Sequence, residues 1–180
     1  MPAANEDKRS ASAVDIAMGI GPIADLSAPT VAEITALQRI ECLIVGSSPF
    51  SPGRSVVTSS ARSQCDSESF DVPVAITNAN ITMGMWRYFD GEDLAWTLMD
   101  DTVLPRVKNY VAVCDAGFTG AVGPVTNLPG EAAAPAAGDV VNIYEILIGS
   151  RSPAYGQDQL QMFNVEIGVI GTRFDVALVA

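Results

Sequence analysis

The sequence predicts a mainly β protein, an antiparallel β-sandwich or barrel with one or two short α-helices on its flank. Several segments alternate apolar and polar residues with the two-residue period of a strand, whereas only two short segments have a helical period. The 180 residues, 48% of them hydrophobic, suit a single domain with a packed core. Because no long crossover helix separates the strands, we expect them to pair antiparallel and to pack sheet on sheet.

The chain divides into an arm and one domain. Residues 1–22 have only a weak period, so we expect an N-terminal arm, containing a short helix at Ala13–Met18, that becomes ordered on assembly. Residues 23–180 predict a single β-sandwich domain. Within it, residues 46–63 and 116–138 are rich in Gly, Pro, Ser or Ala and have no period, which predicts two long loops.

The domain begins with a helix and three strands. Thr30 and Glu33 form a T-x-x-E capping box directly after a proline, which predicts the start of a short helix. Arg39–Val45 alternates and predicts a strand. Cys65–Val74 predicts a short edge strand, because its proline has no N–H for a central ladder. Apolar and polar residues alternate along Ala75–Tyr88, which predicts a strand with one face exposed to solvent.

The second half of the domain continues with a helix and four strands. Apolar residues four apart predict a short amphipathic helix at Glu92–Met99, and we expect Trp96 to anchor it to the sheet. Asn109–Cys114 is rich in strand-forming residues. The last three predicted strands alternate in part and are Val140–Ile148, Leu160–Ile170 and Phe174–Val179.

Charge and composition exclude several classes of function. Acidic residues outnumber basic ones by 21 to 10, the net charge is −11, and the chain has no histidine. Ser-His-Asp catalysis, Cys-His catalysis and histidine zinc ligands are therefore excluded. No basic patch favours wrapping of duplex DNA. The charge-free stretches are too short and too rich in Pro, Gly or Asn for insertion in a membrane. Cys42, Cys65 and Cys114 are widely spaced and indicate buried free thiols.

No residue predicts catalysis, a cofactor or a metal ion. Asp115-Ala116-Gly117 is close to the active-site triplet of aspartic proteases, but Ala replaces the hydroxyl residue and no second copy exists. This triplet therefore indicates the end of a strand and a turn. Asp90–Asp93 and the pair Asp100-Asp101 cluster carboxylates without the alternating order of a calcium loop. We expect these to be helix N-terminal acids.

Six segments, taken in order, carry a resemblance to a known family. They are Asp25–Ile34, Asp93–Leu98, Asn109–Val113, Gly138–Tyr144, Gly149–Arg151 and Phe174–Ala180. This series resembles tail tube proteins, also called major tail proteins, of long-tailed, non-contractile phages that infect actinobacteria. The resemblance covers roughly residues 23–180, and the chain departs from it in residues 1–22 and in the length of the loop 117–137.

The resemblance implies a structural virion protein with a tail-tube-like fold, not an enzyme. Such proteins form rings of six that stack into a hollow tube, through which genomic DNA passes to the host without binding tightly. The implied partners are further copies of the chain, the tape measure protein, the tail terminator and double-stranded DNA in transit. The implied location is the virion tail, after assembly in the host cytoplasm.

If the chain builds a tube, the polar positions of two predicted strands are the candidates to face the lumen. These positions alternate with apolar residues that we expect in the core. The candidates are Asn78, Asn80, Thr82, Asn164 and Glu166.

Two other classes of function stay open. One is another β-sandwich protein of the virion, such as a capsid decoration protein or a tail terminator. The other is a small hydrolase or binding module that depends on carboxylates, for which Asp90–Asp93 is the candidate site.

Overall fold

The computed structural model describes residues 17–45, 50–61, 70–78, 80–87, 94–100, 108–124, 131–155 and 161–180. The elements, in chain order, are β1 Ala17–Gly21, α2 Val31–Ala36, β2 Gln38–Arg39, the 3₁₀ turn η1 Glu41–Leu43, β3 Arg54–Ala61, β4 Phe70–Asn78, β5 Ile81–Trp86, α3 Leu94–Leu98, β6 Asn109–Cys114, β7 Val122–Pro124, β8 Glu131–Ala133, β9 Val140–Tyr155 and β10 Gln161–Ala177. The prediction of a mainly β protein with two short helices is confirmed.

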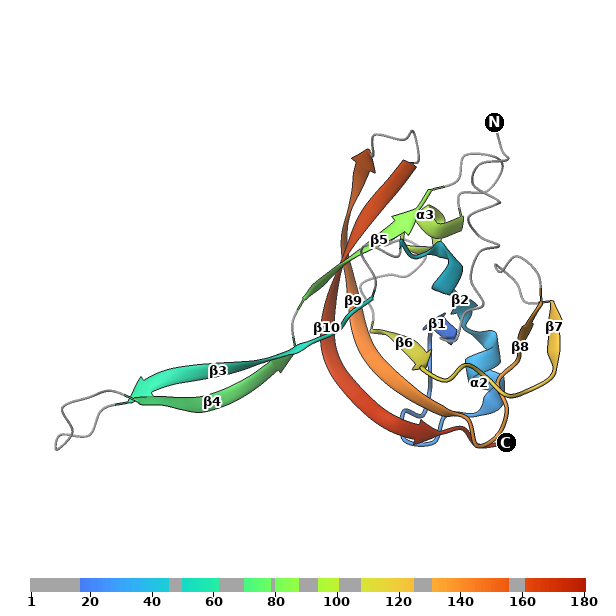
Figure 1. Ribbon diagram of the computed structural model, residues 1–180, viewed down its shortest axis with the longest axis horizontal. Coiled ribbons are helices and arrows are strands. Elements are labelled where there is room, and N and C mark those ends of the chain that lie inside the picture. The colour runs from blue at the N-terminus through green and yellow to red at the C-terminus, as the bar shows by residue number, and fades with distance from the viewer. Residues whose placement is uncertain are drawn as a thin grey trace.

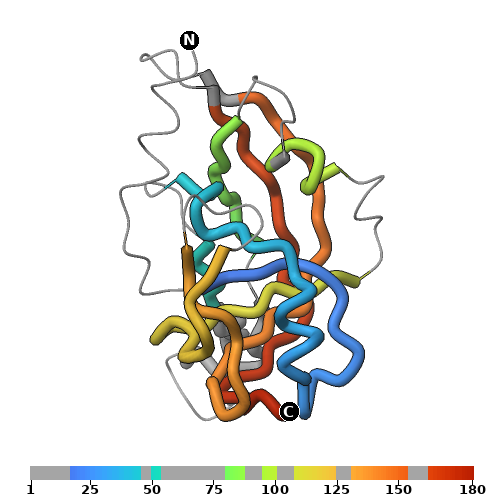
Figure 2. The backbone as a smooth tube through the Cα atoms, turned by 90° about the vertical axis from the view of Figure 1, so that its right-hand side faces the viewer, coloured from blue at the N-terminus to red at the C-terminus, as the bar shows by residue number. Residues whose placement is uncertain are grey.

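Six of the strands form one antiparallel sheet in the order β2-β1-β6-β9-β10-β5. β9 and β10 are long and strongly bent, so the sheet curls around the core as a half-barrel (Figure 1). The ladder between them has three register shifts, which are the irregularities that bend a strand and increase its twist. The helices α2 and α3 lie toward opposite ends of these long strands (Figure 2).

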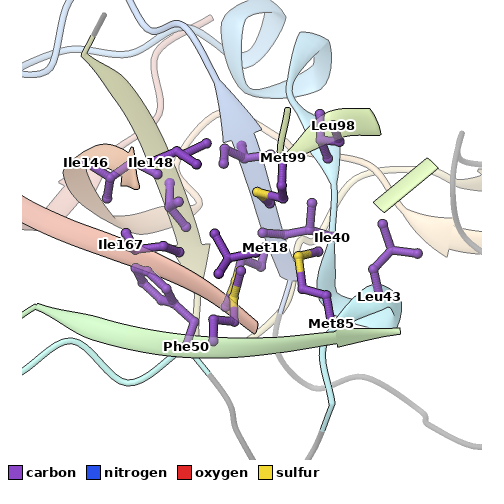
Figure 3. Packing of buried hydrophobic residues seen from close by; sticks show 14 of the residues in the cluster. Met18, Ile40, Leu43, Phe50, Met85, Leu98, Met99, Ile146, Ile148 and Ile167 are labelled. Atoms are coloured by element: carbon purple, nitrogen blue, oxygen red, sulfur yellow. The ribbon is translucent and has the colours of Figure 1, made fainter. Parts of the chain in front are cut away.

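The larger core lies on the concave face of this sheet. It takes alternate residues from β1, β5, β6, β9 and β10. Residues of α3, together with Ile40, Leu43 and Phe50, cover it. In Figure 3 the side chains of Met18, Ile40 and Met85 point toward one another in this cluster. Phe163 and Val165 of β10 are fully buried in it. The two-residue period of the strands therefore places one face of the sheet in the core, as expected.

A smaller core lies on the opposite face of the sheet, under α2. Ile34 of α2 packs there against Ala112 of β6 and Val141 of β9. The predicted capping box starts this helix: the Glu33 N–H donates to Thr30 Oγ1 at 3.2 Å, and the Thr30 N–H donates to Glu33 Oε2 at 2.8 Å. Hydrogen bonds from the backbone of Thr30 and Ala24 lower the pKa of Glu33. α2 therefore covers the end of this face that β1, β6 and the first residues of β9 form.

Trp96 anchors α3 to the sheet, as predicted. Its ring meets the Phe163 ring edge-on at 5.1 Å between centroids. The Arg151 guanidinium lies 4.3 Å from the Trp96 centroid, donates to the Trp96 carbonyl at 2.7 Å and binds Asp100 Oδ2 at 2.9 Å. Asp100 therefore belongs to the attachment of the helix.

Asp139 fixes the predicted loop 116–138. Its nearly buried carboxylate accepts from Thr119 Oγ1 at 2.6 Å, from the Thr119 N–H at 3.2 Å and from the Ala136 N–H at 2.8 Å. Burial raises the pKa of Asp139, but these hydrogen bonds outweigh that effect and lower it below its ordinary value. The segment also holds the short pair of strands β7 and β8, so it is not a loop throughout.

The predicted arm, residues 1–22, includes an integral strand. β1 pairs with β2 on one side and with β6 on the other. The predicted helix at Ala13–Met18 is wrong at its end, because Ala17 and Met18 are in β1, and its other residues lie outside the described ones. Gly19 weakens the strand pattern in the sequence but is needed in the fold, because a Cβ there would lie 2.8 Å from Leu37 Cβ.

The predicted strand at Arg39–Val45 is also wrong. β2 ends at Arg39, and η1 follows. Ile40 and Leu43 are both buried, and a spacing of three suits a 3₁₀ turn better than a strand. Ile44 then forms an isolated antiparallel bridge with Met85 at the edge of β5.

Two other predicted segments are divided differently in the structure. The predicted loop 46–63 contains β3, which pairs with β4. The predicted strand Ala75–Tyr88 is two strands, since β4 ends at Asn78 and β5 begins at Ile81. Conversely, the last two predicted strands, Leu160–Ile170 and Phe174–Val179, belong largely to a single strand, β10. This strand continues through a bulge where Asp175 has a φ of 55°.

Candidate functional site

The strands β5, β10 and β9 leave one face of the sheet exposed. Phe163, Val165 and Ile167 of β10 point into the core, so the residues between them occupy the opposite face. Whereas α2 covers this opposite face near β1 and β6, no described helix covers it near β5. We call this surface the open face. Its members are Asn80, Thr82, Leu147, Ser150, Ser152, Asn164, Glu166 and Ile170.

The open face contains four of the five residues predicted to line a lumen. In the backbone register Glu166 lies opposite Thr82, and Asn164 lies opposite Ser152. Asn80, Thr82 and Glu166 are exposed, and Asn164 is partly exposed. The fifth residue, Asn78, ends β4 opposite Arg54, and its side chain lies outside the described part of the structure.

Two glycines make the centre of the open face shallow. Gly149 and Gly168 lie in a depression of about 570 Å³ that Asn80, Leu147 and Glu166 border. A Cβ on Gly149 would lie 3.1 Å from the Glu166 carbonyl oxygen, so the chains approach closely there. The Ser150 hydroxyl donates to Glu166 Oε2 at 2.8 Å. This carboxylate is therefore held on the surface of the sheet.

Six of the eight members of the open face are polar, Leu147 and Ile170 are exposed apolar side chains, and none of the eight is basic. Glu166 is the acidic residue among the members of the open face. At its border the Lys108 ammonium lies 2.6 Å from Glu145 Oε1, and this hydrogen bond raises the pKa of Lys108. Since tight binding of a phosphate backbone needs clustered Lys and Arg, this face does not suit a DNA-binding site.

The described residues hold no cluster of three or more His, Cys, Asp or Glu suited to a metal ion. Asp115 follows β6 and accepts from Asn142 Nδ2 at 2.8 Å, which agrees with a strand end rather than a catalytic triplet. The candidate carboxylates Asp90–Asp93 lie outside the described residues. Cys114 is buried and its thiol donates to the Gly117 carbonyl at 3.0 Å, Cys42 is partly buried, and Cys65 lies outside the described residues.

None of the helices in the described ranges is both long and apolar enough to cross a bilayer.

The hairpin β3–β4 is an element of the fold whose first strand the sequence analysis missed. It pairs Arg54 with Asn78 at its base and Ala61 with Phe70 at its far end. Figure 1 shows it extending away from the rest of the subunit. The signal was present in the β-branched residues Val56, Val57 and Thr58, but the surrounding serines and glycines obscured it.

Three solved structures are similar to the chain at low identity. A chain of the anti-feeding prophage baseplate is 11% identical, with a TM-score of 0.48, and the match covers 91% of this chain and 93% of that one. A chain of the sheath/tube terminator of the extracellular contractile injection system PVC is 12% identical, with a TM-score of 0.48 and coverage of 90% and 94%. The SPP1 tail tube protein is 13% identical, with a TM-score of 0.44 and coverage of 92% and 78%. No protein of curated function matches the sequence.

The family model described as "Phage tail tube protein" matches residues 5–180, which is nearly the whole chain. This family has a structural role in the phage tail rather than an enzymatic one, in agreement with the resemblance seen in the sequence. The chain therefore belongs to the phage tail tube protein family.

Proposed function

We propose that copies of this protein form rings of six that stack into the hollow tail tube, and that the open face lines the channel for genomic DNA. The observation that carries the proposal is the contrast between the two faces of the β5-β10-β9 region. One face is filled by the core, and the other is exposed, mostly polar and without a basic member among the residues that define it. A channel for DNA needs a wall of this kind.

The charge of the open face suits the passage of a polyanion. DNA binds where Lys and Arg neutralise its phosphates and release counterions. Glu166 instead presents a carboxylate, and Asn80, Thr82 and Asn164 present neutral polar groups. In a ring each carboxylate is repeated in every copy, which makes the potential in the channel negative. DNA therefore slides along the wall rather than binding to it.

Ring closure also gives a role to the edges of the sheet. β5 and the two-residue β2 are the outer strands, and the part of the β5 edge beyond its bridge to Ile44 is a site for pairing with another chain. Pairing between copies closes the strands into one barrel and removes these edges. The projecting hairpin β3–β4 and residues 1–16 serve in this proposal as connectors between copies.

The finer parts of the proposal rest on the six segments that resemble the family. They support a long, non-contractile tail of a phage that infects actinobacteria. They also support assembly in the host cytoplasm around a tape measure protein, with a tail terminator at the end of the tube. Delivery of the genome to the host is the function of the finished tube.

Imaging of the purified full-length protein tests the proposal. Negative-stain microscopy is expected to show tubes, and native mass spectrometry of small assemblies is expected to show multiples of six copies. Single rings that never stack would favour a tail terminator, and trimers bound to capsids would favour a decoration protein. A monomer stabilised by calcium would favour the carboxylate-dependent module.

Variants of Glu166 test the role of the open face separately from assembly. In phage carrying Glu166→Lys, tails are expected to form normally, while the infectious titre falls because each ring then binds the DNA phosphates. Glu166→Gln is the matched control and is expected to retain infectivity, since it introduces no positive charge. Loss of tubes in the Lys variant, with the Gln variant intact, would place this face in a contact between subunits and contradict the proposal.

A further inference from the structure

A cavity of about 270 Å³ lies beside α2 and the strand pair β7–β8. Ile34, Leu37 and Arg39 form its buried walls, and exposed or partly exposed residues line the rest, so it opens on the surface. We call it the α2 cavity. A cavity of about 150 Å³ can already hold a benzene molecule, so the α2 cavity has room for an aromatic ring. Its lining consists of residues 34–39, Pro124, Ala134 and Pro135.

Arg39 gives the α2 cavity a flat, polarised wall. Its Nε donates to Glu41 Oε1 at 2.7 Å, and its Cζ lies 5.2 Å from the centroid of the Phe118 ring. These two contacts hold the guanidinium in place. Glu41 also neutralises its charge, so the cavity has little preference for an anion. A guanidinium does stack on aromatic rings, and the cavity therefore suits an uncharged aromatic side chain.

Phe174 is the aromatic side chain that the surface offers. Among the aromatic side chains that the structure describes, only Phe174 is exposed, over 50% of its surface. Its ring meets the Tyr144 ring edge-on at 6.0 Å, and Tyr144 meets the buried Phe50 in the same way at 5.3 Å. A ring that is already held in place is typical of an interface anchor, because little entropy is lost when a partner covers it.

The Phe174 ring and the α2 cavity of one chain lie on opposite faces of the sheet. Phe174 packs on Tyr144, which contacts the larger core. Ile34 and Leu37 of the cavity belong to the smaller core on the other face. The ring therefore does not enter the cavity of its own chain. We propose that Phe174 of one copy inserts into the α2 cavity of a second copy.

This contact joins two different surfaces, so every copy offers one ring and one cavity. Such a heterologous contact repeats from copy to copy until a ring closes or a filament grows. The exposed Val140 lies on the same side of β9 as Tyr144 and adds apolar surface beside the anchor. The inference rests on the proposed assembly and identifies one of its contacts.

Two tryptophan variants of the full-length protein test the cavity. Ala36 and Ala32 are both exposed on α2, but only Ala36 lines the cavity. Ala36→Trp fills the cavity from its own chain and is expected to reduce the sedimenting, assembled fraction at least tenfold, with unchanged circular dichroism. Ala32→Trp is the matched control and is expected to assemble like the unmodified protein. Equal assembly of the two variants would overturn the inference.

Two serine variants test the ring. Phe174→Ser is expected to reduce the assembled fraction at least tenfold. Ile170→Ser is the matched control, because Ile170 is exposed on the same strand but lies on the open face. It is expected to assemble like the unmodified protein. If Phe174→Ser assembles as well as Ile170→Ser, Phe174 is not an anchor and the inference fails.

Crosslinking identifies the partner of the ring directly. Para-azidophenylalanine replaces Phe174, and the protein is mixed with an isotopically labelled copy before assembly and illumination. Crosslinks between labelled and unlabelled chains are expected at residues 34–39, Pro124 or residues 134–135, and crosslinks only to other segments would overturn the inference. Crosslinks to the cavity in assemblies that are not tubes would support the contact while the proposed tube fails. If tubes form and the crosslinks map elsewhere, only the contact fails.

Discussion

Two N-terminal deletions separate the folding of this subunit from its assembly. Removing residues 2–16 leaves every described strand in place, so we expect a folded subunit. Removing residues 2–22 also deletes β1, which pairs with both β2 and β6 in the middle of the sheet. We expect this longer deletion to abolish folding, although the two variants differ by only a few residues.

The expected size of the effect follows from burial. Met18 and Ile20 of β1 are 7% and 1% exposed, and burial of each such side chain stabilises a protein by about 1.5–3 kcal/mol. Together they contribute about 3–6 kcal/mol, before the lost ladder hydrogen bonds are counted. The net stability of a typical domain is only about 5–15 kcal/mol. The longer deletion therefore removes much or all of the stability.

Circular dichroism and urea unfolding check this prediction. The shorter deletion is expected to give a cooperative transition close to that of the full-length protein, and the longer deletion is expected to give none. A cooperative transition of similar midpoint for the longer deletion would refute the assignment of β1 to the sheet. If the shorter deletion also assembles into normal tubes, residues 1–16 are not connectors, while the fold stands.

Three substitutions test other contacts. Asp139→Ala removes the acceptor of three hydrogen bonds, so we expect a loss of about 2–3 kcal/mol at pH 7 in urea unfolding. Because the folded-state pKa of Asp139 lies below its ordinary value of 3.8, this difference should shrink as the pH falls below about 4, and a growing difference would contradict it. Gly19→Ala should cost about 1–3 kcal/mol in the same assay, whereas Gly123→Ala, which has open space, should be nearly neutral; equal effects would refute the close packing. Arg151→Ala should weaken the attachment of α3 and expose Trp96 to more water, which shifts the tryptophan fluorescence to longer wavelength. An unchanged emission spectrum would contradict the role of Arg151 in this attachment.

The parts of the fold that local chemistry determines were predictable from the sequence. The capping box of Thr30 and Glu33 starts α2, and Asn109–Cys114 is β6 with the predicted bounds. Trp96 contacts Phe163 because a large ring on an amphipathic helix must cover the sheet. In each case neighbouring residues carry the information.

The parts that depend on distant contacts were not predictable. β1 was missed because Gly19 and Gly21 weaken the strand pattern, and only the close approach of Leu37 explains them. β3 was missed because serines and glycines surround its β-branched residues, and its pairing with β4, which the local sequence does not show, completes the strand. The bulge at Asp175 was missed because it joins two segments that appear separate in the sequence.

The candidate site was predictable in part for the same reason. The strand period alone separates Asn164 and Glu166 from the buried residues between and beside them. That Thr82 lies opposite Glu166 depends on the register of β5 against β10, which no local pattern encodes. The exposure of Phe174 and Val179 was hidden, because apolar residues in a terminal strand predict core.

A cryo-EM map of the assembled protein, at a resolution that shows side chains, tests the central claim most directly. The account predicts stacked rings of six with Asn80, Thr82, Asn164 and Glu166 of every copy facing the lumen. Those four side chains on the outer wall of the tube, or buried between neighbouring copies, would contradict it.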